Sequence, residues 1–273
     1  MKDRPVLPIV KITTDIFEEV GGQVFDKSFN PVFTNEHITT RRPLTSSDLL
    51  IHFFHAIDST TFVDYLIVTQ RPELVREHPC WIGDANEVKD AAEAVFGGHV
   101  KTIRKRNVTL ATYVETQADI ERLVPELLKC HDLCRELAVV CNPKEELDFD
   151  SFGPEKHSSL TGWKANAKNE RGWANTPCLD RIIVEGNEHP IHPEWIRSLR
   201  DQCLDANVPF NFAGWGDFVA MGQEVEKLPV GQYEMKTVKD DYYLKVGKEN
   251  AGRLLDGIEH NGVPEIQQPS ESA

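Results

Sequence analysis

Six polar or reactive side chains stand at the end of short apolar runs of this chain or within three residues after it. They are Asp15, Arg71, Glu115, Gln117, Cys141 and Glu185. If each run is a strand of one parallel sheet, these side chains gather at the carboxyl ends of the strands, where such sheets bind ligands. Carboxylates that converge with an arginine could bind a polar substrate or a metal, or supply a general base. The alternative is local: each acid caps a helix or pairs with a nearby arginine.

Histidine and tryptophan extend this candidate set near the sixth run. His189 and His192 flank Pro190 in a rigid turn close to Glu185, which makes them weak candidates for metal ligands. His192 and Trp215 also join the ligand-binding candidates, because they lie just before the last predicted helix and just after the last predicted strand. We predict no metal site beyond this weak pair.

Cysteine spacing offers a second possible metal site. Cys130 and Cys134 lie four residues apart, so on a helix both thiolates could reach one metal ion. Cysteine is among the most buried residue types, however, and core-facing thiols are the simpler interpretation.

Six apolar, β-rich runs recur along the chain and predict the elements that position these side chains. They are residues 7–12, 65–69, 109–114, 137–141, 181–184 and 208–212. Continuous apolar runs are typical of strands buried on both faces. Helical patterns separate them, which favours βαβ units. The predicted fold class is therefore α/β, an incomplete (βα) barrel of about six parallel strands.

Four helices are predicted between the strands, at residues 46–57, 84–96, 119–133 and 193–206. The first begins at a Ser-Ser-Asp cap, and the third should kink or restart at Pro125. Pro193 starts the fourth, and Asn207 ends it. Residues 148–176 lack periodicity and form a long loop. Two β-rich runs that flank Lys239 and Asp240 predict a C-terminal β-hairpin appended to the sheet.

Composition narrows the classes of protein. The chain has 273 residues, 40% of them hydrophobic, and a formal net charge of −14. It has no apolar run of about 18 residues and no secretory signal at its N-terminus, so we expect a cytoplasmic protein without a membrane partner. The negative charge argues against binding to a nucleic-acid backbone. The one basic run, residues 101–106, is interpreted as a solvated loop before a strand.

Short motifs in the same order over nearly the whole chain resemble a known family. The matching stretches are residues 14–19, 66–73, 114–117, 141–143, 192–216 and 246–257. They resemble a phage-type domain family of unknown function, which is distantly similar to radical S-adenosylmethionine (SAM) enzymes and carries a three-cysteine motif. The resemblance implies a radical-SAM-like (βα) domain over residues 1–230. Residues 231–266 then hold the hairpin and the family's C-terminal signature, and residues 267–273 form a disordered tail.

The departures from this family lie at the strand ends. The family's cysteine cluster would precede Asp15, yet Met1 lies only fourteen residues before it. Three thiolates are the minimum protein ligation for a cluster with one open iron. The family's acidic residue between Cys and Pro is Asn142 here, and its Gly-Gly-Glu reads Glu185-Gly186-Asn187. We therefore predict no cofactor; an iron–sulfur cluster and SAM are expected only if a partner chain supplies the cysteines.

Three functional hypotheses follow. The first is a radical-SAM-like protein without a cluster that binds a small polar ligand or a protein partner. The second is a hydrolase or transferase in which Glu115 or Glu185 is the base and Arg71 orients an anionic group. The third is a radical enzyme subunit that a separate cysteine-cluster polypeptide completes.

Overall fold

The structure is a computed structural model of the chain. It describes residues 8–12, 15–17, 23, 28–33, 43–76, 78, 104–151, 158–165, 171–173, 177–225, 234–238 and 240–263. The predicted helix at residues 84–96 lies outside these residues, as do Lys239, Cys80 and the predicted tail.

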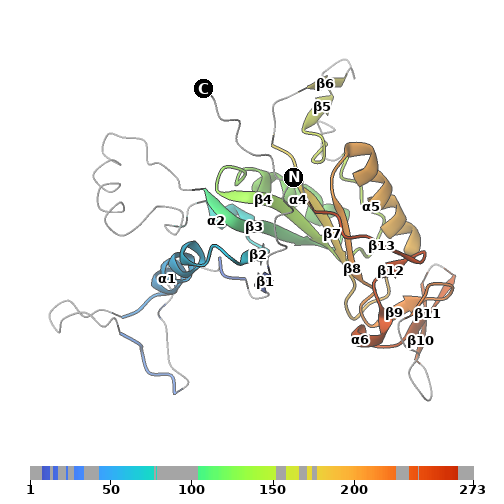
Figure 1. Ribbon diagram of the computed structural model, residues 1–273, viewed down its shortest axis with the longest axis horizontal. Coiled ribbons are helices and arrows are strands. Elements are labelled where there is room, and N and C mark those ends of the chain that lie inside the picture. The colour runs from blue at the N-terminus through green and yellow to red at the C-terminus, as the bar shows by residue number, and fades with distance from the viewer. Residues whose placement is uncertain are drawn as a thin grey trace. The chain divides into compact units, whose positions relative to one another are not determined.

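Six parallel strands form an open half-barrel sheet with helices between them, which confirms the predicted fold class (Figure 1). The order of the strands across the sheet is β1-β2-β3-β4-β7-β8. Their bounds are Ile9–Ile12 (β1), Asp64–Thr69 (β2), Lys105–Val114 (β3), Cys134–Cys141 (β4), Arg181–Glu185 (β7) and Phe210–Gly214 (β8). The central strands β3 and β4 begin earlier than their apolar runs, because polar residues extend the pairing at their amino ends.

The helix α5, Pro193–Ala206, has the predicted bounds. Pro193 occupies its first turn, where a missing N–H costs no hydrogen bond. Asn207 adopts the left-handed conformation (φ 54°) and ends the helix with bonds from its N–H to Cys203 and Leu204. Pattern and cap chemistry agree here, which is why the sequence predicted this element so closely.

Two other helices correct the predictions. Helix α1, Ser46–Ser59, is capped by Thr45 rather than by Ser46, because Thr45 and Asp48 form a reciprocal capping box. Helix α4, Gln117–Leu128, continues through Pro125 and stops before the predicted end. The predicted restart at Pro125 was wrong, whereas the alternative of a kink stays a prediction: α4 buries Ile120, Leu123, Val124, Leu127 and Leu128, and this packing outweighs the one lost helical hydrogen bond. Two short helices, α2 (Pro72–Val75) and α6 (Lys248–Ala251), complete the described set.

The predicted C-terminal hairpin is present. Strands β10 (Met235–Val238) and β11 (Asp241–Lys245) pair antiparallel, and Asp240 takes a positive φ between them. Strand β9 (Phe218–Ala220) extends this pair to a three-stranded sheet. Two smaller antiparallel pairs are β12 with β13 (Leu254–Leu255, Ile258–Glu259) and β5 with β6 (Trp163–Ala165, Arg171–Trp173). The second pair lies within the segment that was predicted as loop.

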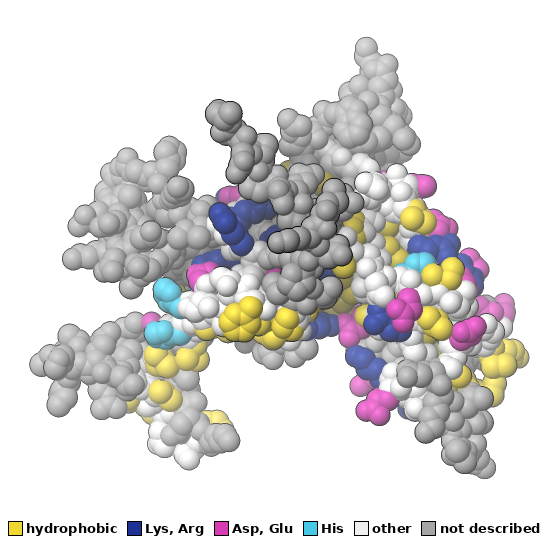
Figure 2. Space-filling model, in the orientation of Figure 1, with side chains coloured by type: hydrophobic (Ala, Val, Ile, Leu, Met, Phe, Trp, Pro, Cys, Tyr) yellow, Lys and Arg dark blue, Asp and Glu magenta, His cyan; other side chains and the backbone are white. Residues whose placement is uncertain are grey.

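The chain divides into two compact units. Unit 1 comprises Met1–Ala111 and Lys129–Arg135, and unit 2 comprises Thr112–Leu128 and Glu136–Ala273. Phe54, Ile57 and Ile67 are fully or nearly fully buried in unit 1, as are Phe212 and Trp215 in unit 2. On the face of unit 2 in Figure 2, acidic and basic side chains alternate over α5 and the C-terminal strands. The domain division predicted from the sequence stays a prediction.

The expectation that the basic run at residues 101–106 is a solvated loop was wrong at Lys105. Lys105 belongs to the basic run that was interpreted as a solvated loop, but it starts β3 and only 3% of its side chain is exposed. Its Nζ lies 2.5 Å from Asp58, and this ion pair makes the burial of the lysine possible. No described helix has both the length and the apolar character needed to cross a membrane.

Candidate functional site

The ends of β3, β4 and β7 in unit 2 hold a group of polar residues that we name the strand-end cluster: Tyr113, Glu115, Asn142, Lys144 and Asn187. Backbone hydrogen bonds fix the loops that carry two of them. Asn142 donates its N–H to the carbonyl of Val114 at 3.0 Å, and Lys144 donates its N–H to that of Glu115 at 2.9 Å. The parallel pairing of neighbouring strands thus continues past their ends and places these side chains together.

The carboxylate of Glu115 is held from two sides. Its Oε2 lies 2.5 Å from Nζ of Lys144, and its Oε1 accepts a long hydrogen bond of 3.4 Å from the Tyr113 hydroxyl. The two members of the ion pair are 28% and 48% exposed, so solvent and solutes reach them. The negative charge of Glu115 and the positive charge of Lys144 offset each other, and the cluster therefore carries no strong net charge.

Tyr113 sits at the inner side of this cluster. Burial raises the pKa of its phenol, and the neighbouring Glu115 charge acts in the same direction. The amides of Asn142 and Asn187 face the hydroxyl and oppose this rise. The phenol is accordingly neutral at pH 7 and can both donate and accept a hydrogen bond.

Asn142 is the most unusual member of the cluster. The residue is 2% exposed, and its Nδ2 has no hydrogen-bond partner among the described residues, even though its amide faces Tyr113. A buried polar group without a partner costs about 1–3 kcal/mol. At the carboxyl end of a parallel strand, such a group is an unsatisfied hydrogen-bond donor.

Glu185 follows β7 and pairs with Lys248 at 3.1 Å. Next to it, the loops after β7 and β8 touch each other through two glycines. A Cβ on Gly186 would lie 2.0 Å from the carbonyl oxygen of Trp215, and one on Gly216 would lie 2.3 Å from that of Asn187. Only glycine permits this approach, and it fixes Asn187 at the edge of the cluster.

Three predicted site residues of unit 2 have structural roles. Gln117 exchanges two hydrogen bonds with the backbone of Asp148, at 2.9 and 3.0 Å. Cys141 is fully buried, and this burial raises the pKa of its thiol well above the ordinary value. Trp215 is also fully buried, and its indole N–H donates to the carbonyl of Leu254 at 2.9 Å.

Unit 1 contains two of the predicted residues, Asp15 and Arg71. The carboxylate of Asp15 accepts hydrogen bonds from the Thr69 hydroxyl at 2.8 Å and the Gln70 N–H at 2.7 Å, so it ties the segment after β1 to the end of β2. Arg71 precedes α2 and pairs with Glu73 at 2.7 Å. Both lie at strand ends, as predicted; their convergence with Glu115 on one mouth stays a prediction.

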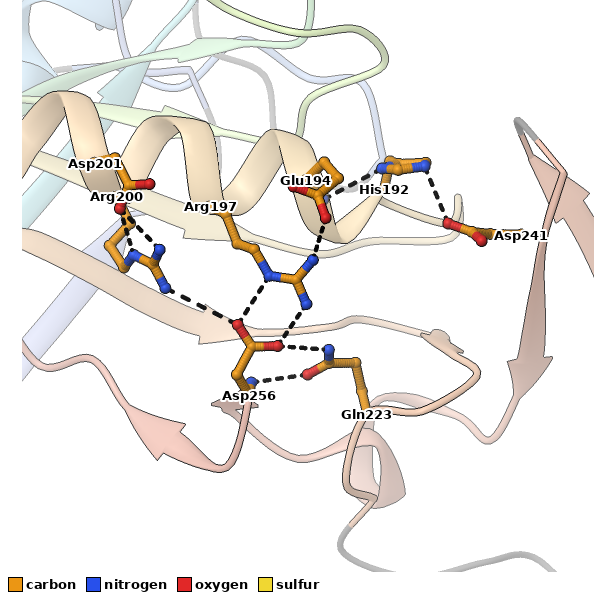
Figure 3. A network of polar contacts seen from close by, with 8 residues as sticks. All are labelled: His192, Glu194, Arg197, Arg200, Asp201, Gln223, Asp241 and Asp256. Atoms are coloured by element: carbon orange, nitrogen blue, oxygen red, sulfur yellow. Dashed lines mark hydrogen bonds and ion pairs between the residues drawn. The ribbon is translucent and has the colours of Figure 1, made fainter.

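His192 caps α5 rather than lying open to a metal. Its Nδ1 accepts from the N–H of Glu194 at 3.2 Å, so the proton is assigned to Nε2, which lies 3.0 Å from Asp241 (Figure 3). Among the residues with described placement, no three His, Cys, Asp or Glu side chains are grouped as metal ligands. Both nitrogens of His192 are thus engaged within the protein.

Figure 3 shows a network that the sequence did not predict, which we name the Asp256 clamp: Arg197, Asp256, Gln223 and Arg200. Arg197 on α5 donates two hydrogen bonds to the Asp256 carboxylate, of 2.9 and 2.6 Å. Gln223 donates a third to the same carboxylate at 2.9 Å, and its side-chain oxygen accepts the backbone N–H of Asp256 at 2.8 Å. The hydrogen bonds from Arg197 lower the pKa of Asp256 far below its usual range. The only sequence signal was that Asp256 lies in the family's C-terminal signature.

The described cysteines do not fit an iron–sulfur cluster. A cluster needs three thiolates that converge on one point. The thiols of Cys130 and Cys134 instead face the carbonyls of Pro72 and Cys130, each at 3.9 Å, and both residues are buried as predicted. Cys203 is buried as well, and Cys178 is exposed.

Comparison with known proteins places the chain in a family. Residues 24–264 match the model of DUF5131, described as a protein of unknown function, and the chain belongs to this family. Comparisons with curated proteins and with solved structures gave no match.

Proposed function

We propose that this protein is a phage-type, radical-SAM-like protein that binds a small polar ligand at the strand-end cluster and carries no iron–sulfur cluster of its own. Its half-barrel of parallel strands is the architecture that this proposal requires, and its DUF5131 membership is compatible with it. The ligand lies over the ends of β3, β4 and β7.

The observation that carries the proposal is the amide of Asn142. Its Nδ2 is buried without a partner, whereas buried side-chain amides normally find one. Around it, Glu115 and Lys144 are partly exposed, so the cluster borders solvent. An acceptor atom on Nδ2 would recover the free energy that the unpartnered donor costs.

The binding proposal is tested by NMR of the side-chain amides in labelled protein. We expect at least one of five probes (acetate, methylammonium, inorganic phosphate, acetamide and uracil) to shift the Asn142 amide resonances saturably. The amide of Asn250 is the matched control, because it donates to the carbonyl of Val246 at 2.8 Å and has no reason to respond. If none of the five probes moves Asn142 in the millimolar range, the proposal is wrong.

The absence of a resident cluster is tested separately. After anaerobic reconstitution with iron and sulfide, we expect no iron–sulfur absorbance, since the described thiols do not converge. A stable visible chromophore that survives desalting would overturn this part. It would favour a radical enzyme instead.

A further inference from the structure

We propose that the strand-end cluster recognises a neutral amide edge, in which a carbonyl oxygen stands next to an N–H. This inference deepens the proposed function and rests on it. It assigns the ligand's chemical class from the hydrogen bonds that the cluster leaves unmade.

The first unmade bond belongs to a donor. Nδ2 of Asn142 carries two protons, and it makes no hydrogen bond of ordinary geometry with the described residues, although the amide faces the Tyr113 hydroxyl. The ligand must therefore present an acceptor oxygen or nitrogen to it.

The second position is an acceptor with spare capacity. Oε1 of Glu115 receives a hydrogen bond of 3.4 Å from Tyr113, well beyond the 2.5–3.0 Å of an ordinary O–H···O bond. A carboxylate oxygen accepts about two hydrogen bonds. A ligand N–H on this oxygen thus gains a full charge-assisted hydrogen bond.

Charge decides between the ligand classes that could fill both positions. A lone anion on Asn142 would face the negative Glu115, and a lone cation on Glu115 would face Lys144 at the other oxygen. Glu145 accepts the N–H of Gln117 at 2.7 Å, so the loop beyond Glu115 adds further negative charge against an anion. A neutral amide meets neither repulsion and leaves the Glu115–Lys144 pair intact.

Tyr113 is the common neighbour of the two positions. Its hydroxyl contacts Glu115 and is faced by the Asn142 amide, so the donor and the acceptor flank one phenol. A single amide likewise presents an acceptor oxygen next to a donor N–H. Two sources offer this edge, a primary carboxamide and the lactam of a nucleobase.

The test compares the five probes by the concentration that half-shifts the Asn142 resonances. We expect acetamide, uracil or both to act at concentrations about ten-fold below those of acetate, phosphate and methylammonium. A response to acetamide alone assigns the carboxamide source, and one to uracil alone assigns the lactam; both results support the inference. If a charged probe acts at the lowest concentration, the inference fails while the proposed function survives. If no probe acts, both fail.

A variant supplies the second readout. Asn142→Leu keeps the branched side-chain shape and removes the donor. With binding to parent and variant followed at the Asn187 side-chain amide of the same cluster, we expect a loss of amide binding of at least about five-fold. We also expect a higher melting temperature, because the unpartnered buried amide is gone. Ser198→Ala on α5 is the control, with unchanged binding. Undiminished affinity of Asn142→Leu would overturn the inference; were this variant to fail to fold, the probe series on the parent protein would still decide.

Discussion

At the scale of single residues, the described part of the chain buries lysine, arginine and glutamate side chains where an opposite charge meets them. Arg181 at the start of β7 and Glu136 in β4 are 9% and 7% exposed and form a hydrogen bond of 2.8 Å. Nε of Arg181 has no partner among the described residues, so the pair is not fully satisfied. Removal of one member leaves an isolated buried charge, which costs far more than the pair itself contributes.

We therefore expect Glu136→Ala to lower the free energy of unfolding by about 3–5 kcal/mol. The double variant Glu136→Leu/Arg181→Met should recover most of this loss, because two apolar side chains replace two buried charges. Urea denaturation measures the free energy of unfolding of both variants. Arg122→Ala is the comparison: Arg122 is 60% exposed in its pair with Asp119, and its loss should cost less than about 1 kcal/mol. A double variant as unstable as Glu136→Ala would contradict this account.

Residue types after the apolar runs predicted part of the candidate site. Glu115 follows β3 as expected, but its partner Lys144 comes from the next strand end, and no local spacing connects the two. Asn142 was interpreted as a lost acidic residue, and its unpartnered amide could be found only from burial and geometry. Trp215 and Cys141 were ambiguous in sequence, because a residue next to a strand end can point inward as well as toward a ligand.

At the scale of elements, the capping residues and apolar spacing of the sequence predicted α5. They carried no signal for the contacts between loops. Pro193 and Asn207 fix both ends of α5 without help from the rest of the fold. Helix α4 continues past Pro125 with its apolar face buried, a tertiary effect that local propensity does not encode. The approach of the β7 and β8 loops likewise depends on a contact between residues about 30 positions apart, and in the sequence Gly186 and Gly216 resemble ordinary turn glycines.

Gly186→Ala tests this approach. The new Cβ would lie 2.0 Å from the Trp215 carbonyl oxygen, a backbone atom that no rotamer change can move. We expect a loss of stability above about 2 kcal/mol, because the two loops must separate. Gly222→Ala is the matched control: its Cβ meets nothing within 4 Å, so only its positive φ of 94° adds strain. Equal melting temperatures for the two variants would argue against a tight contact.

At the scale of the whole molecule, the C-terminal segment of unit 2 covers an otherwise open sheet edge. Phe212 donates its N–H to the carbonyl of His260 at 2.9 Å, and Gly262 donates its N–H to that of Phe210 at 2.8 Å. Strand β8 is the last strand of the half-barrel, and an uncovered edge invites pairing with other chains. The Asp256 clamp fastens the same segment to α5, so a charged contact protects the sheet edge.

This arrangement makes the C-terminal segment sensitive to acid. The Arg197 hydrogen bonds lower the pKa of Asp256 in the folded state, whereas an unfolded aspartate titrates near 3.9. Below about pH 4 the unfolded chain therefore binds a proton that the folded chain does not. The free energy of unfolding consequently decreases as the pH is lowered. The clamp's contribution is complete above that range and is lost as the pH approaches the lowered pKa. Asp256 is 35% exposed, so solvent screening keeps this contribution modest.

Asp256→Asn should flatten this pH dependence, since asparagine does not titrate and tolerates the positive φ of 54° at this position. We expect its unfolding free energy to fall less steeply than that of the parent between pH 4 and pH 2.5. Hydrogen exchange at the amides of Phe212 and Gly262 should also be faster in the variant at neutral pH, because the segment is held less tightly. Ser198→Ala, on the same helix, should change neither measurement. Parallel pH profiles for parent and variant would show that Asp256 does not fasten the segment that covers β8.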